Sequence, residues 1–381
     1  IGTRANEDAP PAAADAPPAA RVREAGGVIL GKTTMPDYGM LSSGMSSIHG
    51  LTRSPWGVDR NPSGSSSGAA AAGAARYAPL HIGTDIGGSV RLPATHCGLV
   101  GLKPSLGRVP VHPPYMGRAA GPIARTALDA ALLLDVLARP DARDFMSLPP
   151  ARPEYARGLE GLDPGTLRIG LLPDMAVGLP VHPEVRGAAE AAAAALKRAG
   201  ARVDEMPSFL TAEMLDGMVR FFEARSHHDL MGLSRERRAK VLPFIVEWCT
   251  WRASGFSGRD VMAAYGLVMA MREATVAACQ PYDFVLSPTS PILPYEATAA
   301  CPGNDPHDAL PHIAFTVPYN MSEQPAASIN WTASAGGLPI GVQVIGRRFD
   351  DAGVLRLARL LETLRPAQLP WPEPDSSPAI K

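Results

Sequence analysis

Residues 61–107 read NPSGSSSGAAAAGAARYAPLHIGTDIGGSVRLPATHCGLVGLKPSLG, and this stretch decides how the chain is interpreted. It holds two serine- and glycine-rich loops, SGSSSG at 63–68 and GGS at 87–89, separated by an Ala-rich run and a short apolar segment. Because glycine has no Cβ, such loops let backbone N–H groups and hydroxyls approach a ligand closely. The two loops predict a preassembled site for a small polar group and favour acyl transfer by a serine.

Local signals predict a helix and a strand between these loops. Ser67 and Gly68 can begin a helix over 69–75, whose alanines have the highest helix propensity. The apolar residues 80–84 predict a short strand, and the glycines at 87–88 predict a turn directly after it. The sequence therefore places each loop at the end of a regular element.

The rest of the chain alternates between strand and helix patterns. A strand at 167–172, a helix at 184–199 and a strand at 201–206 predict a β-α-β crossover, which builds parallel sheets. Other predicted strands lie at 28–30, 284–287, 326–330 and 340–345, and other predicted helices lie at 126–138 and 351–363. We therefore expect one α/β fold in which helices surround a mixed central β-sheet.

We expect residues 1–381 to form a single large domain, because no internal repeat or long linker divides them. Helical periodicity continues over 211–280, with breaks at 242–243 and 254–258. This segment is expected to form a helical cap within the domain.

Composition excludes several classes of protein. Of the 381 residues, 46% are hydrophobic and 19% are charged, which is typical of a globular chain, and the formal net charge is −1. Neither a nucleic-acid partner nor a membrane is expected, since no basic excess and no apolar run of about 20 residues is present. The cysteines are widely spaced, which predicts reduced thiols in a cytoplasmic protein and no metal site: Cys97, Cys249, Cys279 and Cys301.

Six motifs in a fixed order extend the pattern around the two loops. They are GKTTMP at 31–36, NPSGSSSGAAAA at 61–72, GTDIGGSVRLPATHCGLVGLKPSLGRVP at 83–110, GPIARTALDAALLLDVL at 121–137, YDFVLSPTSP at 282–291 and GLPIGVQVIGRRFDD at 337–351. Together they resemble the amidase signature family. The region 140–280 carries little of the signature, and we expect it to hold the substrate-specific variation.

The resemblance implies a catalytic role for each loop. Ser89 matches the family's nucleophile, and Ser65 matches the bridging serine that lies next to a cis peptide bond. The backbone N–H groups of Ile86, Gly87 and Gly88, with that of Ser89, would form the oxyanion hole. Such donors stabilise the tetrahedral intermediate of acyl transfer. No cofactor and no metal is implied.

The general base is the residue that the motifs do not supply. The resemblance implies a buried lysine with a lowered pKa, in a motif that would fall before Ile1. We therefore expect the chain as given to lack the N-terminal part of its domain. Lys32 is expected to form a structural ion pair, and Lys103 is also expected to be structural.

Other residues near the loops have competing interpretations. Residues 64–68 also fit the G-x-S-x-G elbow of α/β hydrolases, in which Ser66 would be the nucleophile, but that motif needs a strand directly before it. His96 is expected to be a hydrogen-bonded packing residue. Asp85 and Arg91 are expected to form a buried pair that holds the nucleophile loop.

These expectations together predict an enzyme that hydrolyses a small carboxylic amide to the acid and ammonia or an amine. One alternative is the glutaminase subunit of a transamidation complex, which resembles the same family. Another is a non-catalytic amidase-like binding protein, which requires that the upstream lysine be truly absent. The expected partner is a small-molecule amide, and a homodimer is the commonest oligomer of soluble proteins.

Overall fold

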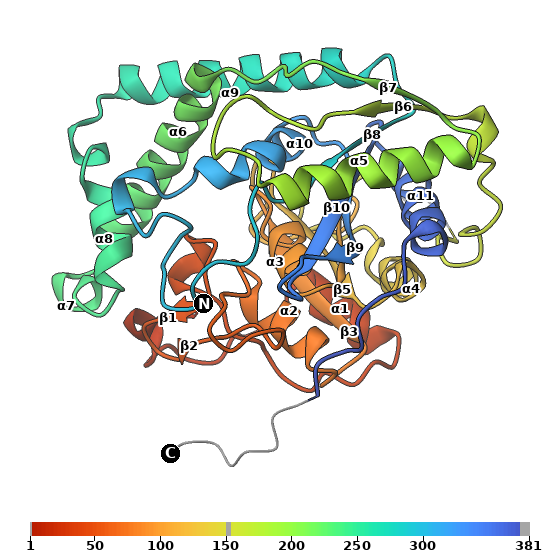
Figure 1. Ribbon diagram of the computed structural model, residues 1–381. Helices are drawn as coiled ribbons and strands as arrows, with labels where there is room; N and C mark the ends of the chain where they lie inside the picture. Colours follow the sequence, from red (N-terminus) through yellow and green to blue (C-terminus); the bar gives the residue numbers. More distant parts are fainter. Residues whose placement is uncertain (1, 150–153, 374–381) are drawn as a thin grey trace.

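A central sheet of eight strands organises the molecule (Figure 1). The structure is a computed structural model and describes residues 2–149 and 154–373. The strand order is β3-β5-β4-β9-β10-β8-β6-β7. Strand β6 runs parallel to both β7 and β8, and the other neighbours are antiparallel. The predicted fold class, a mixed sheet surrounded by helices, is confirmed.

The strands of this sheet are β3 (Leu80–Asp85), β4 (Val100–Lys103), β5 (Ala119–Ala124), β6 (Arg168–Leu171), β7 (Arg202–Glu205), β8 (Phe284–Pro288), β9 (Ala326–Ala333) and β10 (Pro339–Gly346). A separate two-stranded sheet joins β1 (Met45–Ser46) and β2 (Gly50–Leu51). The helices of eight residues or more are α1 (Pro17–Glu24), α2 (Ser67–Ala74), α4 (Ala127–Leu137), α5 (Pro183–Arg198), α6 (Ala212–Met231), α8 (Pro243–Thr250), α9 (Gly258–Cys279) and α11 (Asp351–Leu364). Shorter helices are α3 (Arg91–His96), α7 (Arg235–Arg238) and α10 (Val317–Met321).

Buried side chains form a core with two large parts. One part joins the sheet to α4, α5 and α11, and the other joins it to α6, α8, α9 and α10. All residues of β9 and β10 are buried except for two near the end of β9, as expected for strands covered on both faces. The core therefore encloses the middle of the sheet and holds the loops that leave it in fixed positions.

Strands β4 and β5 were not predicted, because glycine and proline interrupt their apolar pattern. A Cβ on Gly121 would lie 1.9 Å from the Leu102 carbonyl oxygen, so glycine lets these two strands approach closely. Strand β5 pairs with β4 only at Ala124 and Ile123. Pro122 lies just outside this pairing, so its missing N–H removes no hydrogen bond between the two strands.

The predicted buried strand at 28–30 is wrong. These residues belong to no strand, and Val28 and Leu30 are 84% and 77% exposed. A strand needs a neighbouring strand to pair its backbone groups, and no described strand pairs with these residues. An apolar run of three residues therefore does not specify a strand by itself.

The segment 211–280 is helical, and its helices lie along the top and the left side of Figure 1. Helix α6 begins at Thr211, whose side chain accepts a hydrogen bond from the Met214 N–H, and α9 begins with a capping box formed by Ser257 and Asp260. The breaks expected at 242–243 and 254–258 separate α7, α8 and α9.

Helix α9 is both long and apolar. Within the part of the chain that the structure describes, it alone meets the length and composition expected of a membrane-spanning helix, with a mean hydropathy of 1.2. It packs against α6 and also against α10. Met262 is 64% exposed and Met269 is 39% exposed, so part of its apolar surface faces outward.

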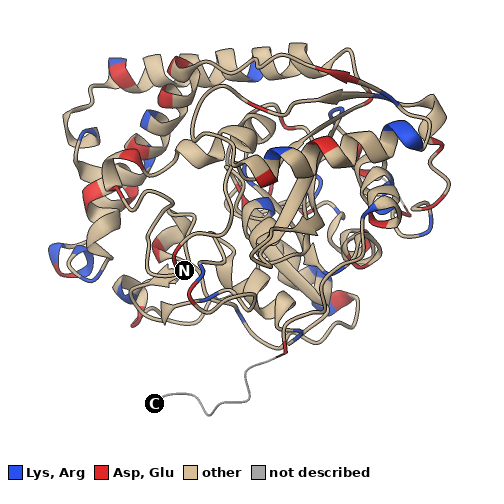
Figure 2. Cartoon of the chain, viewed as in Figure 1, with Lys and Arg blue, Asp and Glu red and all other residues tan. Residues whose placement is uncertain are grey.

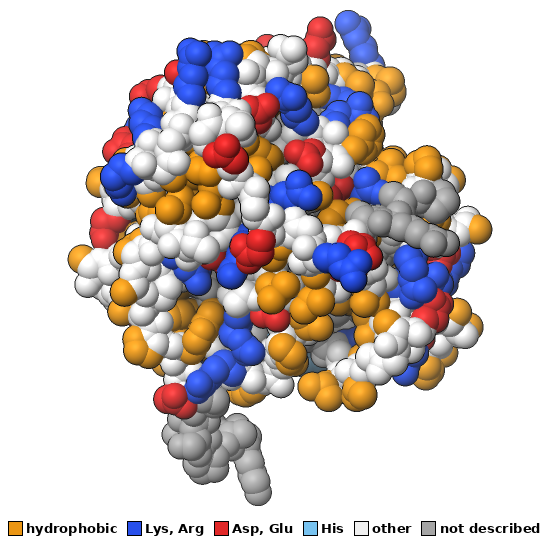
Figure 3. Space-filling model, turned by 90° about the vertical axis from the view of Figure 1, so that its right-hand side faces the viewer, with side chains coloured by type: hydrophobic (Ala, Val, Ile, Leu, Met, Phe, Trp, Pro, Cys, Tyr) orange, Lys and Arg blue, Asp and Glu red, His pale blue; other side chains and the backbone are white. Residues whose placement is uncertain are grey.

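Charges of both signs are distributed over the outer elements (Figure 2). On the face drawn in Figure 3, basic and acidic side chains alternate with hydrophobic ones. All four cysteines are free and buried. Burial raises the pKa of the Cys97, Cys249 and Cys279 thiols to about 12.

Candidate active site

Asn61, which is fully buried, anchors the first serine loop at residues 63–68. Its Oδ1 accepts hydrogen bonds from the N–H groups of Gly44 and Ser63, both at 3.0 Å, and its Nδ2 donates to the Ala299 carbonyl at 3.0 Å. The peptide bond between Gly64 and Ser65 is cis, as the family resemblance implies. A single buried amide thus fixes the loop that carries Ser65.

The two serine loops are joined directly. The Ser66 N–H donates to the Ser89 carbonyl at 3.3 Å, so Ser65 and Ser89 belong to adjoining segments. Ser65 is 4% exposed, whereas Ser89 is partly exposed at the surface of a cavity. No hydrogen bond joins the two serine side chains in the described residues. The structure therefore brings Ser65 and Ser89 close together, but their hydroxyls do not form a hydrogen bond with each other among the described contacts.

The alternative nucleophile, Ser66, lies in a different setting. Residues 61–65 form no strand, although the elbow motif requires one directly before the serine. The Ser66 hydroxyl lies 3.2 Å from the Thr84 nitrogen and 3.3 Å from the Thr84 carbonyl oxygen. This hydroxyl fastens the loop to β3, which is a structural role.

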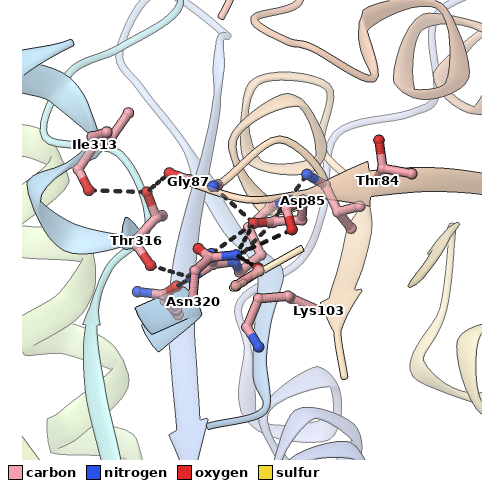
Figure 4. Close-up of polar contacts among 12 residues, drawn as sticks. Thr84, Asp85, Gly87, Lys103, Ile313, Thr316 and Asn320 are labelled. Carbon is pink, nitrogen blue, oxygen red and sulfur yellow. Dashed lines mark hydrogen bonds and ion pairs between the residues drawn. The ribbon is translucent and has the colours of Figure 1, made fainter. Parts of the chain in front are cut away.

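A buried ion pair holds the nucleophile loop (Figure 4). The Arg91 Nη2 atom lies 3.0 Å from the Asp85 Oδ1 atom, and both side chains have 0% exposure. Asn320 donates to the same carboxylate at 2.8 Å and to the Gly117 carbonyl at 3.0 Å. Arg91 also donates to Gln343 at 2.7 Å and to the Thr316 carbonyl at 3.0 Å. The predicted scaffold pair of Asp85 and Arg91 is confirmed.

The Asp85 carboxylate is charged in this cluster. Burial by itself would raise its pKa, but the charge and hydrogen bonds of Arg91, with the bond from Asn320, lower the pKa to about 2. The charged carboxylate accepts hydrogen bonds from the N–H groups of Gly88 at 2.8 Å and Val90 at 3.1 Å. Asp85 therefore acts as the internal clamp of the turn that carries Ser89.

The backbone of the turn determines which N–H groups could stabilise an oxyanion. The Gly88 N–H points to Asp85, while Ile86, Gly87 and Ser89 donate no backbone hydrogen bond among the described residues. The Gly87 carbonyl accepts a bond from the Thr316 hydroxyl at 2.5 Å, which fixes the orientation of that peptide. The oxyanion-hole assignment stays a prediction. Its free donors are the N–H groups of Ile86, Gly87 and Ser89.

Glycine is required at position 88 by both its conformation and its surroundings. Gly88 has a φ of +128°, and a Cβ there would lie 2.5 Å from the Thr316 hydroxyl oxygen. A side chain would therefore be strained and would displace Thr316.

Within the described residues, neither Lys32 nor Lys103 forms a hydrogen bond with Ser65 or Ser89, the serines predicted to be catalytic. Lys103 is buried at the end of β4, and burial, together with the charge of Arg91, lowers its pKa to about 7. Its amine donates to the Pro104 carbonyl at 2.9 Å and points away from Asp85 in Figure 4. Lys32 is exposed and forms no ion pair with a described residue, so the structure does not contain the ion pair expected for it there.

His96 lies behind the site as a neutral side chain. Burial lowers its pKa to about 4, and its Nε2 atom lies 3.2 Å from the Ser290 hydroxyl. This contact confirms the expected packing role. Residues 2–149 and 154–373 contain no group of three His, Cys, Asp or Glu side chains suited to a metal ion.

A small cavity of about 40 Å³ opens at Ser89. One wall comes from the nucleophile turn, including Ile86 and Gly87. The facing residues come from the loop at 39–42, from α6 and α8, and from the segment before α10: Gly39, Met40, Leu41, Ser42, Phe222, Arg225, Trp248, Leu310 and Ile313. Sequence reasoning missed these facing residues, because they lie far from the serines along the chain and form no motif.

The comparison with known families agrees with this geometry. Residues 1–355 match the family described as Amidase. The chain belongs to the amidase signature family. The enzymes of this family are hydrolases that act on carbon–nitrogen bonds, so this amidase is an enzyme of that class.

Two curated relatives illustrate the range of this family. The amidase is 33% identical to the A subunit of the glutamyl-tRNA(Gln) amidotransferase of Desulforapulum autotrophicum, over 91% of this chain and 77% of that protein. It is 32% identical to the putative amidase AmiB2 of Mycobacterium tuberculosis, over 94% of this chain and 77% of that protein.

Solved structures give the same result. A bacterial aryl acylamidase superposes on this amidase with a TM-score of 0.87 at 29% identity, covering 96% of this chain and 79% of that one. A 6-aminohexanoate cyclic dimer hydrolase superposes with a TM-score of 0.81 at 31% identity, covering 93% and 79%.

Proposed function

We propose that this amidase cleaves a small carboxylic amide through an acyl-enzyme on Ser89. The observation that carries the proposal is the cavity at Ser89, which Ile86 and Gly87 also line. The N–H groups of these three residues donate no other backbone bond in the described chain. A carbonyl carbon beside the Ser89 hydroxyl would thus have free donors within reach of its oxygen, as acyl transfer requires.

In the proposed reaction, Ser89 attacks the amide carbonyl and Ser65 relays the proton of the attacking hydroxyl to the base. The tetrahedral intermediate expels the nitrogen after that nitrogen receives the proton through the same relay. Water then attacks the ester formed with Ser89 and releases the acid. The free enzyme is regenerated by the reverse proton path.

We propose that the base is a lysine that precedes Ile1 in the natural protein. The position of the Lys103 amine supports this choice, because its one hydrogen bond within the described residues goes to Pro104 rather than to Ser65 or Ser89. The coding sequence upstream of Ile1 tests this directly. A gene without such a lysine would favour a non-catalytic binding protein.

Covalent labelling tests the nucleophile. The protein expressed from its complete gene is treated with a fluorophosphonate, and its intact mass is measured alongside the Ser89→Ala and Ser66→Ala variants. We expect a single adduct on the wild type and on Ser66→Ala, and none on Ser89→Ala. Labelling that persists in Ser89→Ala would identify another serine, and an unlabelled, folded wild type would oppose the acyl-enzyme.

The similarity to the A subunits of amidotransferases makes a glutaminase subunit the second candidate. A stand-alone amidase should release ammonia or an amine from amides other than glutamine when purified alone. A glutaminase subunit should act on glutamine and respond to its partner proteins. Steady-state assays of the purified chain distinguish these functions.

The remaining context is also part of this proposal. The free, buried thiols support a reducing cytoplasmic location. The formal net charge of −1 supports a small molecule rather than nucleic acid or an anionic membrane as the partner. The exposed methionines of α9 support contact with a second copy, and light scattering of the purified protein tests for that homodimer.

A further inference from the structure

The cavity at Ser89 has a second wall with a distinct chemistry. Helix α6 contributes Phe222 and Arg225 to it, and α8 contributes Trp248. These side chains face the nucleophile turn across the cavity. A ligand whose carbonyl lies at Ser89 would therefore present the rest of its structure to α6 and α8.

Two of the three nitrogens of the Arg225 guanidinium lack protein partners among the described residues. Its Nε and Nη1 atoms are buried and have no hydrogen-bond partner among the described residues. Arg225 also forms no ion pair within residues 2–149 and 154–373. By contrast, Glu223 on the same helix is paired with Arg252 at 2.5 Å.

Aromatic rings position this guanidinium without satisfying those two donors. Its central carbon lies 5.2 Å from the centroid of the Tyr115 ring and 5.6 Å from that of Phe222. Such cation–π contacts stabilise the charge through the ring faces, but they provide no acceptor in the plane of the N–H groups. The side chain is therefore held in place, while these two donors are left for other acceptors.

Trp248 adds a donor of the same kind. Its indole Nε1 is also buried and unpartnered among the described residues, and the side chain is 2% exposed. Arginine and tryptophan side chains donate hydrogen bonds and cannot accept them. The polar groups on this wall thus favour a ligand rich in acceptors.

The nearby charges also favour an anion. Arg118 lies over the same Tyr115 ring at 5.4 Å, and no described acidic side chain forms an ion pair with it. Burial lowers the pKa of Arg118, and the neighbouring charge of Arg225 lowers it further. Asp229, one turn after Arg225 on α6, is exposed and lies outside ion-pair distance of both arginines. Among the described residues that line the cavity, Arg225 is the one charged side chain, so the wall carries a positive charge.

We propose that the amide substrate carries a carboxylate, which Arg225 binds through two N–H groups opposite Ser89, with the Trp248 indole donating to the same anion. A planar carboxylate matches the arginine fork: it would satisfy the buried Nη1 donor together with Nη2, while the Trp248 indole donates to the same anion. The small cavity places this carboxylate only a few bonds from the scissile carbonyl. This inference rests on the proposed function, because it assumes that the amide carbonyl lies at Ser89.

The test compares the mono-amides of three- to five-carbon dicarboxylic acids with their methyl esters. Each compound is titrated as a protectant against fluorophosphonate labelling of Ser89 in the protein expressed from its complete gene. We expect the best acid to protect at a concentration about tenfold or more below that of its ester, as for a hydrogen bond to a charged group. Equal protection by acids and esters would overturn the inference.

Variants at Arg225 assign the preference to this side chain. In Arg225→Met, the ester and the acid should protect Ser89 at nearly equal concentrations, so that the ratio of the two is close to one. Arg225→Lys keeps the charge but loses the fork, so it should retain part of the preference for the acid. The control is Arg220→Met on the same helix, whose guanidinium pairs with Asp216, and it should keep the wild-type ratio. A ratio unchanged in folded Arg225→Met would overturn the inference.

Two further measurements separate this inference from the proposed function. Circular dichroism establishes that each variant is folded, and calorimetry measures binding of the acids and esters to Ser89→Ala without any reaction. If Ser89 is labelled but acids bind no better than esters, the carboxylate site is overturned and the proposed chemistry is not. Unlabelled Ser89 with Arg225-dependent binding of acids would overturn the proposed chemistry and leave the carboxylate site supported.

Discussion

The ion pair at the serine loops is fully buried, whereas the ion pairs within the helical segment 212–279 keep at least one partner in contact with solvent. Near the loops, Asp85 and Arg91 are completely buried and bond to each other and to the backbone. In the helical segment, the Arg220–Asp216 pair lies at the surface, with side chains 44% and 36% exposed. The turn that carries Ser89 thus rests on an enclosed network, in which losing one partner leaves a buried charge unpaired. Part of the cavity wall at Ser89 belongs to the helical segment, which has ion pairs at the surface.

Breaking the enclosed pair should have the largest effect on stability. Arg91→Met leaves the Asp85 carboxylate buried and uncompensated, which typically destabilises a protein by about 3–5 kcal/mol. Urea unfolding should show this loss. Arg220→Met removes an exposed pair and should change stability by about 1 kcal/mol or less. Equal losses in the two variants would contradict the contrast between the regions.

Adding one methyl group beneath the nucleophile loop should have the next largest effect. A Cβ on Gly101 in β4 would lie 2.5 Å from the Ala94 Cβ and 2.7 Å from the Val90 carbonyl oxygen. Gly101→Ala should therefore destabilise the protein by about 1–3 kcal/mol through overpacking. Thermal unfolding measures this change, and an unchanged midpoint would mean that α3 can move away from the sheet.

Acid should weaken the enclosed region through two buried histidines. Burial lowers the pKa of His96 to about 4 and that of His312 to about 3, both below the usual 6.5. Between pH 6.5 and 4 the unfolded chain binds more protons, so stability falls as the pH is lowered through this window. Each histidine should contribute a loss of roughly 1 kcal/mol between pH 7.5 and 5.5.

Urea unfolding at these two pH values measures the loss. His312→Phe should reduce it by the share of one histidine, because neither His312 nitrogen has a described partner that the substitution would remove. The same measurement on a variant of His228, which is exposed on α6, is the control. A pH dependence that His312→Phe leaves intact would assign the effect to other groups.

The smallest effect is expected in the helical segment and has the opposite sign. Gly266 lies on the exposed side of α9, and a Cβ there would meet no atom within 4 Å. Gly266→Ala should stabilise the protein by about 0.5–1 kcal/mol, because alanine has the higher helix propensity. A loss in thermal stability would show that this face of α9 is in contact with something else, such as a second copy.

The sequence predicted what depends on local signals. Helix α2, strand β3 and the turn at Gly87 and Gly88 follow from a run of alanines, an apolar stretch and paired glycines. The pairing of Asp85 with Arg91 was also predicted from their positions around Ser89. These residues lie close together along the chain, so their spacing reflects their spatial arrangement.

The sequence did not predict what long-range packing decides. Arg225 and Trp248 line the cavity only because α6 and α8 fold back over the nucleophile turn, and nothing in their local sequence marks them. The same applies to Thr316 and Asn320, which fix the turn from α10 and the residue before it, more than two hundred residues away. Propensity and periodicity describe elements, and they do not specify which faces meet.

The buried cysteines can report local unfolding of this protein. In the folded state an alkylating reagent finds four enclosed sulfur atoms, three of them with a pKa of about 12, and few thiolates to attack. Modification must wait for a fluctuation that exposes each site. Cys97 directly follows α3, the helix after the turn that carries Ser89, and Cys249 lies on α8. Measuring the alkylation rate of each cysteine would therefore compare how often the regions around Cys97 and Cys249 unfold locally, without any added probe.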